Sequence, residues 1–267
     1  MKTLEVKLDA RGVLWVSLNR PDVRNAFNQD VIQELSDVFT KQVTPQVRAI
    51  VLRGNGPAFC AGGDLNWMKQ AVQMDYAENL KDTKRLAEMF ALLNECPKPV
   101  IGLIQGAAIG GGVGLVSICD IAIASQETQF SLSEVRLGIV PACIGPFVIS
   151  KIGASPARGP FVSAERFDAA KAQRVGLVHE LVATPADLDT AAERILGNIL
   201  QCGPNAMAVA KELVLDLSWP ERRAQHPDCL QYVAKRLADI RVSPEGKEGV
   251  SAFLEKRKPS WLTGGGA

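Results

Sequence analysis

Short apolar runs alternate with amphipathic segments through the first half of the chain, and this alternation limits the possible folds more than any other feature. The apolar runs cover residues 48–54, 97–106 and 120–125 and are predicted strands. The segments 20–43 and 76–96 space their apolar residues as amphipathic helices do. Because strands separated by helices usually pair in parallel, the pattern predicts an α/β fold with a largely parallel sheet.

The two ends of the chain have a different character. Residues 4–20 alternate apolar and polar positions around a short turn and are predicted to form two strands. After about residue 145 the pattern becomes helical, and we expect helices over residues 157–176, 185–202, 204–219 and 226–259. We therefore expect an α/β core over residues 1–200 and a helical region over residues 201–267, whose last six residues would be flexible.

Charge and cysteine usage argue against several classes of function. The 267 residues include 30 basic and 29 acidic side chains, so the net charge of +1 gives no general attraction to nucleic acid or to an anionic membrane. The six cysteines form no C-x-x-C pair, and Cys96, Cys119 and Cys143 stand among apolar neighbours as reduced core thiols would. Since no secretion or import signal and no run of 18 apolar residues is present, we expect a cytoplasmic protein.

A glycine-rich segment, residues 106–120, has five glycines in its first nine positions and runs from a predicted strand into an apolar stretch. Amide groups at the start of a helix have no partner within the helix and carry the positive end of its dipole. Glycines there let a ligand oxygen approach the backbone. No G-x-G-x-x-G and no G-x-x-x-x-G-K-[ST] motif can be found in the chain, which argues against a dinucleotide fingerprint and a phosphate loop.

Two explanations of the glycines remain open: an oxyanion hole, and close packing of a helix against a strand. A second glycine-rich segment, residues 59–68, also follows a strand and leads into a helix-like stretch. Two such segments could direct two amide groups at one oxygen, although spacing alone does not bring them together.

Three motifs resemble the enoyl-CoA hydratase/isomerase superfamily, the crotonases. They are "AFCAGGDL" (58–65), "PKPVIGLIQGAAIGGGVGLVSICDIAIAS" (97–125) and "QFSLSEVRLGIVP" (129–141), and the resemblance extends over residues 3–261. It implies a spiral of βαβ repeats with a carboxy-terminal helical trimerisation region, in a homotrimer or homohexamer. Within the superfamily the chain is most similar to bacterial hydratases of 3-methylglutaconyl-CoA and related carboxy-enoyl-CoA substrates.

The resemblance also assigns catalytic roles. In crotonases two backbone amides hold the thioester oxygen, and the matching residues here are Gly63 and Gly111. Hydratases with two catalytic glutamates place one two residues after the triple glycine, where this chain has Gly114, and a second at the position of Glu134. The resemblance therefore implies a hydratase with one carboxylate. Without the resemblance, a solvated turn residue that pairs with Arg136 would be the favoured interpretation of Glu134.

Coenzyme A is expected as part of the substrate, with no metal and no separate cofactor. The family's contacts to it match Arg24, Ala61, Gly63, Asp64 and Leu65, together with Phe253 and Lys256 from a neighbouring subunit. Phe253 could instead be a core residue, and Lys256 belongs to a charge run that could simply be solvated. Trp67 could line the acyl pocket or serve packing alone.

The resulting hypothesis is a lyase that hydrates a branched 2-enoyl-CoA, for example 3-methylglutaconyl-CoA. A distal carboxylate on the acyl group would need a cation, and the candidates by neighbourhood are Arg136, Lys151 and Arg158. Two alternatives keep the scaffold: an enoyl-CoA isomerase or an acyl-CoA decarboxylase. A third is a non-catalytic relative that binds coenzyme A or RNA.

Overall fold

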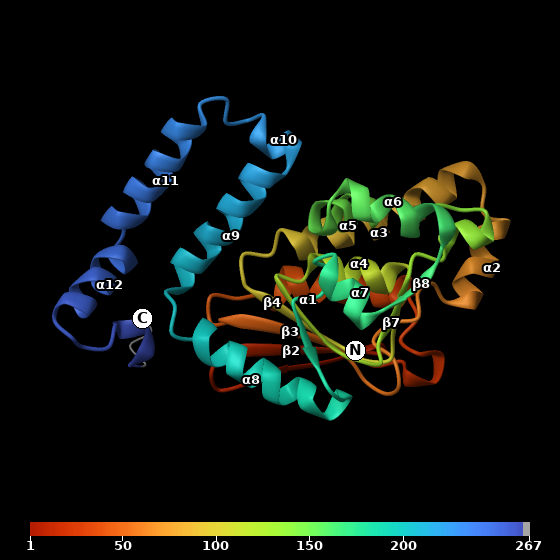
Figure 1. Cartoon of the computed structure of the whole chain (residues 1–267), viewed down its shortest axis with the longest axis horizontal. Coiled ribbons are helices and arrows are strands. Elements are labelled where there is room, and N and C mark those ends of the chain that lie inside the picture. Colours follow the sequence, from red (N-terminus) through yellow and green to blue (C-terminus); the bar gives the residue numbers. More distant parts are fainter. Residues whose placement is uncertain (264–267) are drawn as a thin grey trace.

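The computed structural model describes residues 1–263, and it contains two sheets with helices on both faces of the larger one (Figure 1). The larger sheet has the order β1-β2-β3-β4-β6-β9, with strands β1 (Leu4–Leu8), β2 (Val13–Leu18), β3 (Ala49–Gly54), β4 (Val100–Ile104), β6 (Ile121–Ser125) and β9 (Glu180–Val182). Its first pair of strands is the expected antiparallel hairpin, and all of its remaining pairs are parallel. The expected α/β class is therefore confirmed.

A smaller sheet continues from the larger one and has the order β5-β7-β8. Its strands are β5 (Ala107–Ile109), β7 (Gln129–Ser131) and β8 (Arg166–Asp168). The chain passes from β4 into β5 through Gly106, whose φ of +64° and close approach to the Pro57 carbonyl oxygen leave no room for a side chain. This bend sends the glycine-rich segment away from the larger sheet.

The helices are α1 (Gln29–Lys41), α2 (Leu65–Gln73), α3 (Tyr76–Asn94), α4 (Gly111–Ile118), α5 (Gly145–Ile152), α6 (Ala154–Ser163), α7 (Ala169–Arg174), α8 (Leu188–Ile199), α9 (Pro204–Ser218), α10 (Pro220–Arg223), α11 (Cys229–Val242) and α12 (Pro244–Leu254). Short 3₁₀ helices are η1 (Pro21–Val23), η2 (Glu134–Leu137), η3 (Pro185–Asp187) and η4 (Ser260–Leu262). Among these helices none is long and apolar enough to cross a bilayer.

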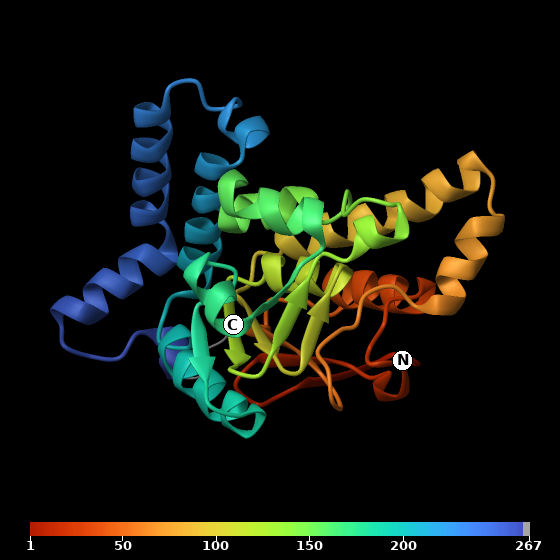
Figure 2. The same ribbon diagram turned by 45° about the vertical axis from the view of Figure 1, so that its right-hand side comes forward.

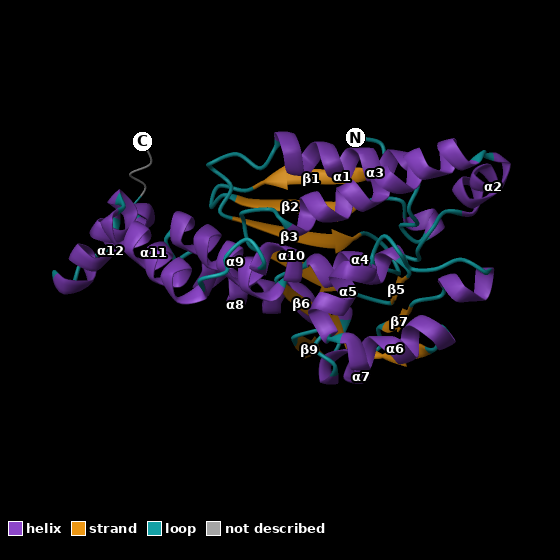
Figure 3. Cartoon of the chain, turned by 90° about the horizontal axis from the view of Figure 1, so that it is seen from above, coloured by secondary structure: helices purple, strands orange, loops and turns teal. Residues whose placement is uncertain are grey.

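Each face of the larger sheet has its own hydrophobic core. Alternate residues of β3 show the division: Ile50 and Leu52 join the core beneath α1, α3 and α4, whereas Val51 joins a second core under α8. Helices α1 and α3 lie side by side above the amino-terminal strands (Figure 3). Because both faces are covered, the central strands are mainly apolar, as their sequences predicted.

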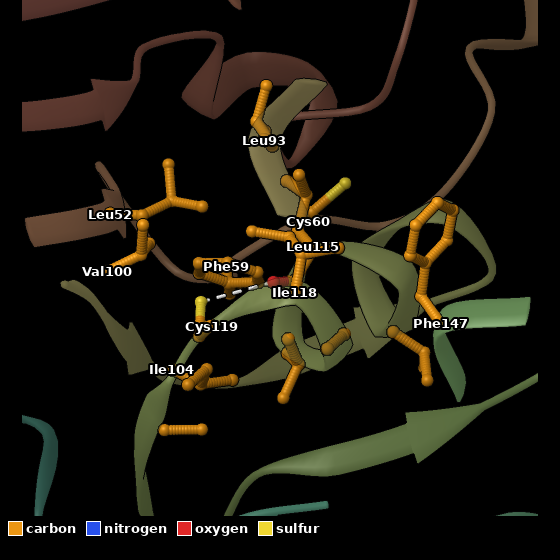
Figure 4. Packing of buried hydrophobic residues seen from close by; sticks show 14 of the residues in the cluster. Leu52, Phe59, Cys60, Leu93, Val100, Ile104, Leu115, Ile118, Cys119 and Phe147 are labelled. Atoms are coloured by element: carbon orange, nitrogen blue, oxygen red, sulfur yellow. Dashed lines mark hydrogen bonds between the residues drawn. The ribbon is translucent and has the colours of Figure 1, made fainter. Parts of the chain in front are cut away.

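Helix α4 lies at the centre of the main core. All of its residues after Gly111 are buried. Leu115 and Cys60 both belong to this core, and the Cys119 thiol donates a hydrogen bond of 3.1 Å to the Leu115 carbonyl oxygen (Figure 4). Burial raises the pKa of Cys119 to about 12, so this cysteine is a core thiol as expected.

The carboxy-terminal helices α9 to α12, residues 204–254, form an arm that extends from the body (Figure 1). Within the arm only Asp216 and Ala252 are buried. Its exposed apolar side chains are Val214, Leu217, Leu230, Leu237, Val242, Val250, Phe253 and Leu254. An arm with so many exposed apolar side chains has a surface suited to another chain.

Two expectations for the second half need correction. The segment 157–176 is interrupted by strand β8, because Phe167 pairs with Phe130 of β7, and β9 is a further strand. The segment 226–259 is two helices, because Ser243 caps the second and Pro244 cannot continue the first. The tail of the chain is described only to residue 263, so the flexibility expected for its last residues lies largely outside the described residues.

Candidate active site

The two glycine-rich segments lie side by side. Strand β5 ends at Ile109, Gly110 turns the chain with a φ of +52°, and α4 begins at Gly111. The Cys60 amide donates to the Ala107 carbonyl oxygen at 3.0 Å, and the Ile109 amide donates to the Cys60 carbonyl oxygen at 2.9 Å. Tertiary structure thus supplies the proximity that spacing alone left open.

Close packing explains one glycine of the triplet. A Cβ on Gly112 would lie 2.5 Å from the carbonyl oxygen of Cys60. The two segments could not approach to this distance with a side chain between them. Close packing therefore accounts for Gly112, and an oxyanion hole stays the other explanation for the glycines of this segment.

Phe27 connects the two segments. Its amide donates to the Gly62 carbonyl oxygen at 2.6 Å, and its own carbonyl oxygen accepts from the Asp64 amide at 2.7 Å. The edge of its ring lies 3.0 Å from where a Cβ on Gly111 would be. Phe27 and Gly63 form an isolated parallel β-bridge. Because Phe27 also contacts Gly111, it fixes the distance between the two glycines.

The amides of Gly63 and Gly111 are free to bind a ligand. Within residues 1–263 neither amide donates to a protein acceptor, and both glycines line one cavity of about 620 Å³. Gly111 is the first residue of α4, so its amide carries the positive end of a helix dipole. Two such amides on one cavity are suited to an oxygen that gains negative charge.

The cavity is mainly apolar. Its apolar walls are formed by Phe27, Trp67, Met68, Ala71, Leu86, Ile139, Val140, Pro141, Ala142 and Ile144. They come chiefly from α2, α3 and the loop between η2 and α5. Trp67, for which packing and pocket lining were both considered, does line the cavity.

Glu134 opens η2 and lines the same cavity as the two glycines. Its Oε2 atom is buried and has no hydrogen-bond partner among the described residues. Its Oε1 atom would lie 2.9 Å from a Cβ on Gly110, so the carboxyl group sits against the start of α4. Burial raises the pKa of Glu134, which its own backbone amide partly offsets. This is the environment of a proton-transferring carboxylate.

Arg136 does not pair with Glu134. It lines a different cavity, so the interpretation of Glu134 as an ion-paired turn residue is not supported. The other two proposed partners of a distal carboxylate are also elsewhere: Lys151 donates to the Cys119 carbonyl oxygen in a third cavity, and Arg158 is exposed on α6. The lining of the acyl-sized cavity includes no lysine, arginine or histidine.

The position of the missing glutamate is filled by apolar side chains. A Cβ on Gly114 would lie 2.4 Å from Ile144 Cγ2 and 2.8 Å from Phe90 Cε1. The chain therefore lacks both the first carboxylate and the space for it. The remaining acid of the cavity, Asp82, has both carboxylate oxygens occupied by hydrogen bonds, so Glu134 is the one carboxylate available for proton transfer on this lining.

A second cavity of about 370 Å³ contains Arg24 and Ala61, two of the residues matched to coenzyme A contacts. Arg136 and Arg166 share it, so three guanidinium groups surround one space. Ile109, which lies two residues before Gly111, also lines this cavity. A phosphate-bearing ligand is suited to such a set of arginines.

The other predicted coenzyme A contacts have different positions. Asp64 is buried, caps α2 and forms an ion pair of 2.8 Å with Arg20, so its carboxylate positions the loop that precedes α2. Neither Asp64 nor the exposed Leu65 lines the two cavities. Phe253 is 82% exposed and Lys256 is exposed just after α12, at the opposite end of the molecule from α2 (Figure 2). Neither residue lines the two cavities of its own chain.

Sequence reasoning missed much of the cavity lining, including two side chains that carry polar chemistry, Asp82 and Cys143. Asp82 is a buried carboxylate on α3, and its place on the inner face of an amphipathic helix was the available signal. Cys143 lines the cavity and is only partly buried, which corrects its assignment as a core thiol. Among the described residues no group of three or more histidine, cysteine or acidic side chains is arranged to hold a metal ion.

Known proteins resemble this chain in both sequence and fold. The enoyl-CoA hydratase/isomerase family model matches residues 9–264. The crystal structure of an enoyl-CoA hydratase from Shewanella pealeana ATCC 700345 is 40% identical, covers 97% of this chain and 96% of its own, and superposes with a TM-score of 0.91. The 2,3-dehydroadipyl-CoA hydratase of Escherichia coli K12 is 32% identical over 93% of this chain and 94% of its own. A peroxisomal Delta(3,5)-Delta(2,4)-dienoyl-CoA isomerase of Arabidopsis thaliana is 32% identical over 97% and 96%.

Proposed function

Because this chain belongs to the enoyl-CoA hydratase/isomerase family and has the crotonase fold, we propose that it adds water across the double bond of a 2-enoyl-CoA with Glu134 as its single proton-transferring carboxylate. The observation that carries the proposal is that the free amides of Gly63 and Gly111 and the unpartnered Oε2 of Glu134 line one apolar cavity.

The amides bind the thioester oxygen. Negative charge develops on this oxygen when a nucleophile adds at Cβ, and the two preorganised donors stabilise the enolate as it forms. In an apolar, water-poor cavity each such donor contributes more than it would in bulk water. Loss of one oxyanion donor typically lowers kcat by about 10²–10³.

Glu134 moves the proton. Its ionised carboxylate takes a proton from water as the water oxygen bonds to Cβ, and the Cα=Cβ pair of electrons passes toward the thioester oxygen. The protonated Glu134 then returns the proton to Cα, so the net change is the addition of one water. A raised pKa suits a carboxylate that must both accept and donate a proton.

The acyl group is proposed to be uncharged. The cavity offers no cation on its lining and contains the carboxylates of Glu134 and Asp82, which would repel a distal carboxylate on the substrate. This argues against the expectation of 3-methylglutaconyl-CoA, although the similarity to a 2,3-dehydroadipyl-CoA hydratase keeps a carboxy-enoyl substrate in the test. Coenzyme A is proposed to extend toward Arg24 and Ala61.

The arm is proposed to join chains into a homotrimer or homohexamer. Its exposed apolar side chains support this, as does the position of Phe253 and Lys256 far from their own chain's cavities. In such an assembly these two residues would contact the coenzyme A bound to a neighbouring chain.

The test is a hydration assay with crotonyl-CoA, 3-methylcrotonyl-CoA and 3-methylglutaconyl-CoA, followed by loss of the conjugated thioester absorbance and by product mass. We expect a gain of one water on the uncharged substrates and little on 3-methylglutaconyl-CoA. Glu134→Gln should lower kcat by about 10²–10⁴, since general acid–base catalysis contributes about that much. Glu127→Gln, in an exposed turn, is the matched control.

Isomerisation is the second candidate, because one carboxylate suffices for it and the family includes the Arabidopsis isomerase. Proton exchange at Cα in D₂O without water addition to any substrate would support isomerisation and contradict hydration. Activity of Glu134→Gln within tenfold of the parent would contradict both functions as proposed.

A further inference from the structure

Asp82 is a buried acid that the proposed chemistry does not use. It lies on α3, is 7% exposed, and lines the cavity of Gly63, Gly111 and Glu134. Burying a carboxylate is costly unless hydrogen bonds replace its hydration. Its two partners therefore indicate what the acid does.

Both partners of Asp82 come from other helices. Its Oδ2 atom accepts a hydrogen bond of 2.8 Å from the indole nitrogen of Trp67 on α2, and its Oδ1 atom accepts one of 3.1 Å from the Gln29 side-chain amide on α1. One carboxylate thus connects α1, α2 and α3. Hydrogen bonds to an ionised acceptor are stronger than those between neutral groups.

Helix α2 depends on this connection. None of its residues is buried, and at its end its backbone is joined to α3 through Asn79, which donates to the carbonyl oxygens of Ala71 and Met74 at 3.2 and 3.0 Å. Along the helix itself, the Trp67 indole is the side chain that bonds to α3. Figure 2 shows α2 and the start of α3, in orange, projecting from the body of the molecule.

Trp67 connects this bond to the proposed oxyanion hole. Its Cε3 atom lies 3.9 Å from where a Cβ on Gly63 would be, and its indole nitrogen points to Asp82 on α3. The indole therefore extends from the carbonyl end of the cavity toward α3. A short acyl group would meet only the near edge of the ring, whereas a longer one would follow its length.

We propose that Asp82 is a positioning residue that holds the Trp67 indole as the wall along which the acyl chain lies, and that this bond sets the preference of the cavity for long over short uncharged acyl groups. The inference rests on the proposed function, because it takes the cavity as the acyl site. It requires no proton transfer by Asp82, whose two oxygens are already occupied.

The test measures binding, so that it does not depend on catalysis. The dissociation constants of butyryl-CoA and octanoyl-CoA, both saturated, are measured by calorimetry for the parent chain and for Asp82→Leu, Asp82→Asn, Trp67→Phe and the Asp82→Leu/Trp67→Phe double variant. We expect Asp82→Leu and Trp67→Phe each to weaken octanoyl-CoA about tenfold more than butyryl-CoA. The double variant should be no worse than either single one, because both remove the same bond.

Two controls separate positioning from general damage. Asp82→Asn keeps an acceptor for the indole and should restore the parent ratio of the two constants to within about twofold. Trp15→Phe removes a comparable indole–carboxylate bond, of 3.4 Å to Asp9, outside the cavity and should leave the ratio unchanged. In the hydration assay, the acidic limb of the pH profile should stay in place in Asp82→Asn, since Glu134 is untouched.

An unchanged ratio in both Asp82→Leu and Trp67→Phe overturns the proposal, and so does additivity of the two effects in the double variant. If Asp82→Leu does not fold, the ratio of the two dissociation constants is compared between Trp67→Phe and Trp15→Phe. An equal ratio in these two variants overturns the proposal. Failure of the parent chain to hydrate any enoyl-CoA, with the binding ratio as expected, would contradict the proposed hydration but not the use of this cavity as the acyl site.

Discussion

Gly114 and Ile144 compete for one space: a Cβ placed on the glycine would lie 2.4 Å from the isoleucine Cγ2 atom. In crotonase hydratases with two catalytic glutamates, the residue at the position of Gly114 is an acid. Here the first of these carboxylates is absent, and apolar side chains have closed the volume that it would occupy. The cavity is consequently shaped for chemistry by Glu134 alone.

The packing around Gly114 predicts that even one added methyl group is harmful. Gly114→Ala should lower the free energy of unfolding by about 1–3 kcal/mol, the usual cost of overpacking a core. Gly197→Ala is the matched control, since α8 leaves open space at that position and alanine is preferred to glycine within a helix. Urea unfolding of the two variants measures the difference, and equal stabilities would contradict the packing described.

Gly63 and Gly111 should respond differently to added side chains. A Cβ on Gly63 would meet the flexible end of Met68 at 3.1 Å, so Gly63→Ala should retain activity within about tenfold. A Cβ on Gly111 would meet the Phe27 ring at 3.0 Å, and the larger Gly111→Val should displace the amide and lower kcat by about 10²–10³. Steady-state kinetics on crotonyl-CoA decide the matter, and a Gly111→Val variant as active as Gly63→Ala would argue against an oxyanion hole at Gly111.

Hydration should fail at low pH. The proposed mechanism begins with ionised Glu134, whose pKa burial raises above the ordinary glutamate value. The logarithm of kcat/KM should therefore fall with decreasing pH, with a midpoint above about 4.3. A flat profile down to that pH would show that Glu134 does not act as the base.

The same residue should cost the protein stability at neutral pH. A raised pKa in the folded state means that folding favours the protonated acid, so this stabilising contribution is present at low pH and is lost as the pH rises through the raised pKa. Glu134→Gln removes the buried charge and should raise Tm at pH 7 relative to the parent. The difference should vanish below about pH 4, where unfolded glutamate is also protonated. A Gln variant that melts lower than the parent at pH 7 would contradict this account of the site.

The exposed apolar face of the arm predicts self-association. Light scattering should give three or six times the chain mass of 28.7 kDa. Leu237→Lys, which places a charge on that face, should shift the protein toward smaller species.

Lys256→Ala should keep the assembly and raise KM, because the proposal places this lysine against the coenzyme A of a neighbouring chain. A parent protein that stays monomeric at micromolar concentration would remove the basis for both statements.

Local sequence signals predict most of the strand and helix order of the first half, because apolar runs and 3.6-residue spacing indicate β1 to β4, β6, α1 and α3, which the structure confirms. The short strand β5 was not predicted. The sequence also identified Gly63, Gly111 and Glu134, which the structure brings to one cavity. Their assignment came from motifs, and the catalytic roles remain predictions. Short strands such as β8 were missed since three residues carry too little periodicity, and pairing with β7 decides their conformation.

The surroundings of these residues depend on tertiary packing. The direction of Arg136 away from Glu134, the filling of the Gly114 position by Ile144 and Phe90, and the bond from Trp67 to Asp82 all join segments distant in the chain. Local sequence specifies backbone preference and the apolar face of a helix. It does not specify which side chain occupies a given volume, because that depends on the packing of all neighbouring elements at once.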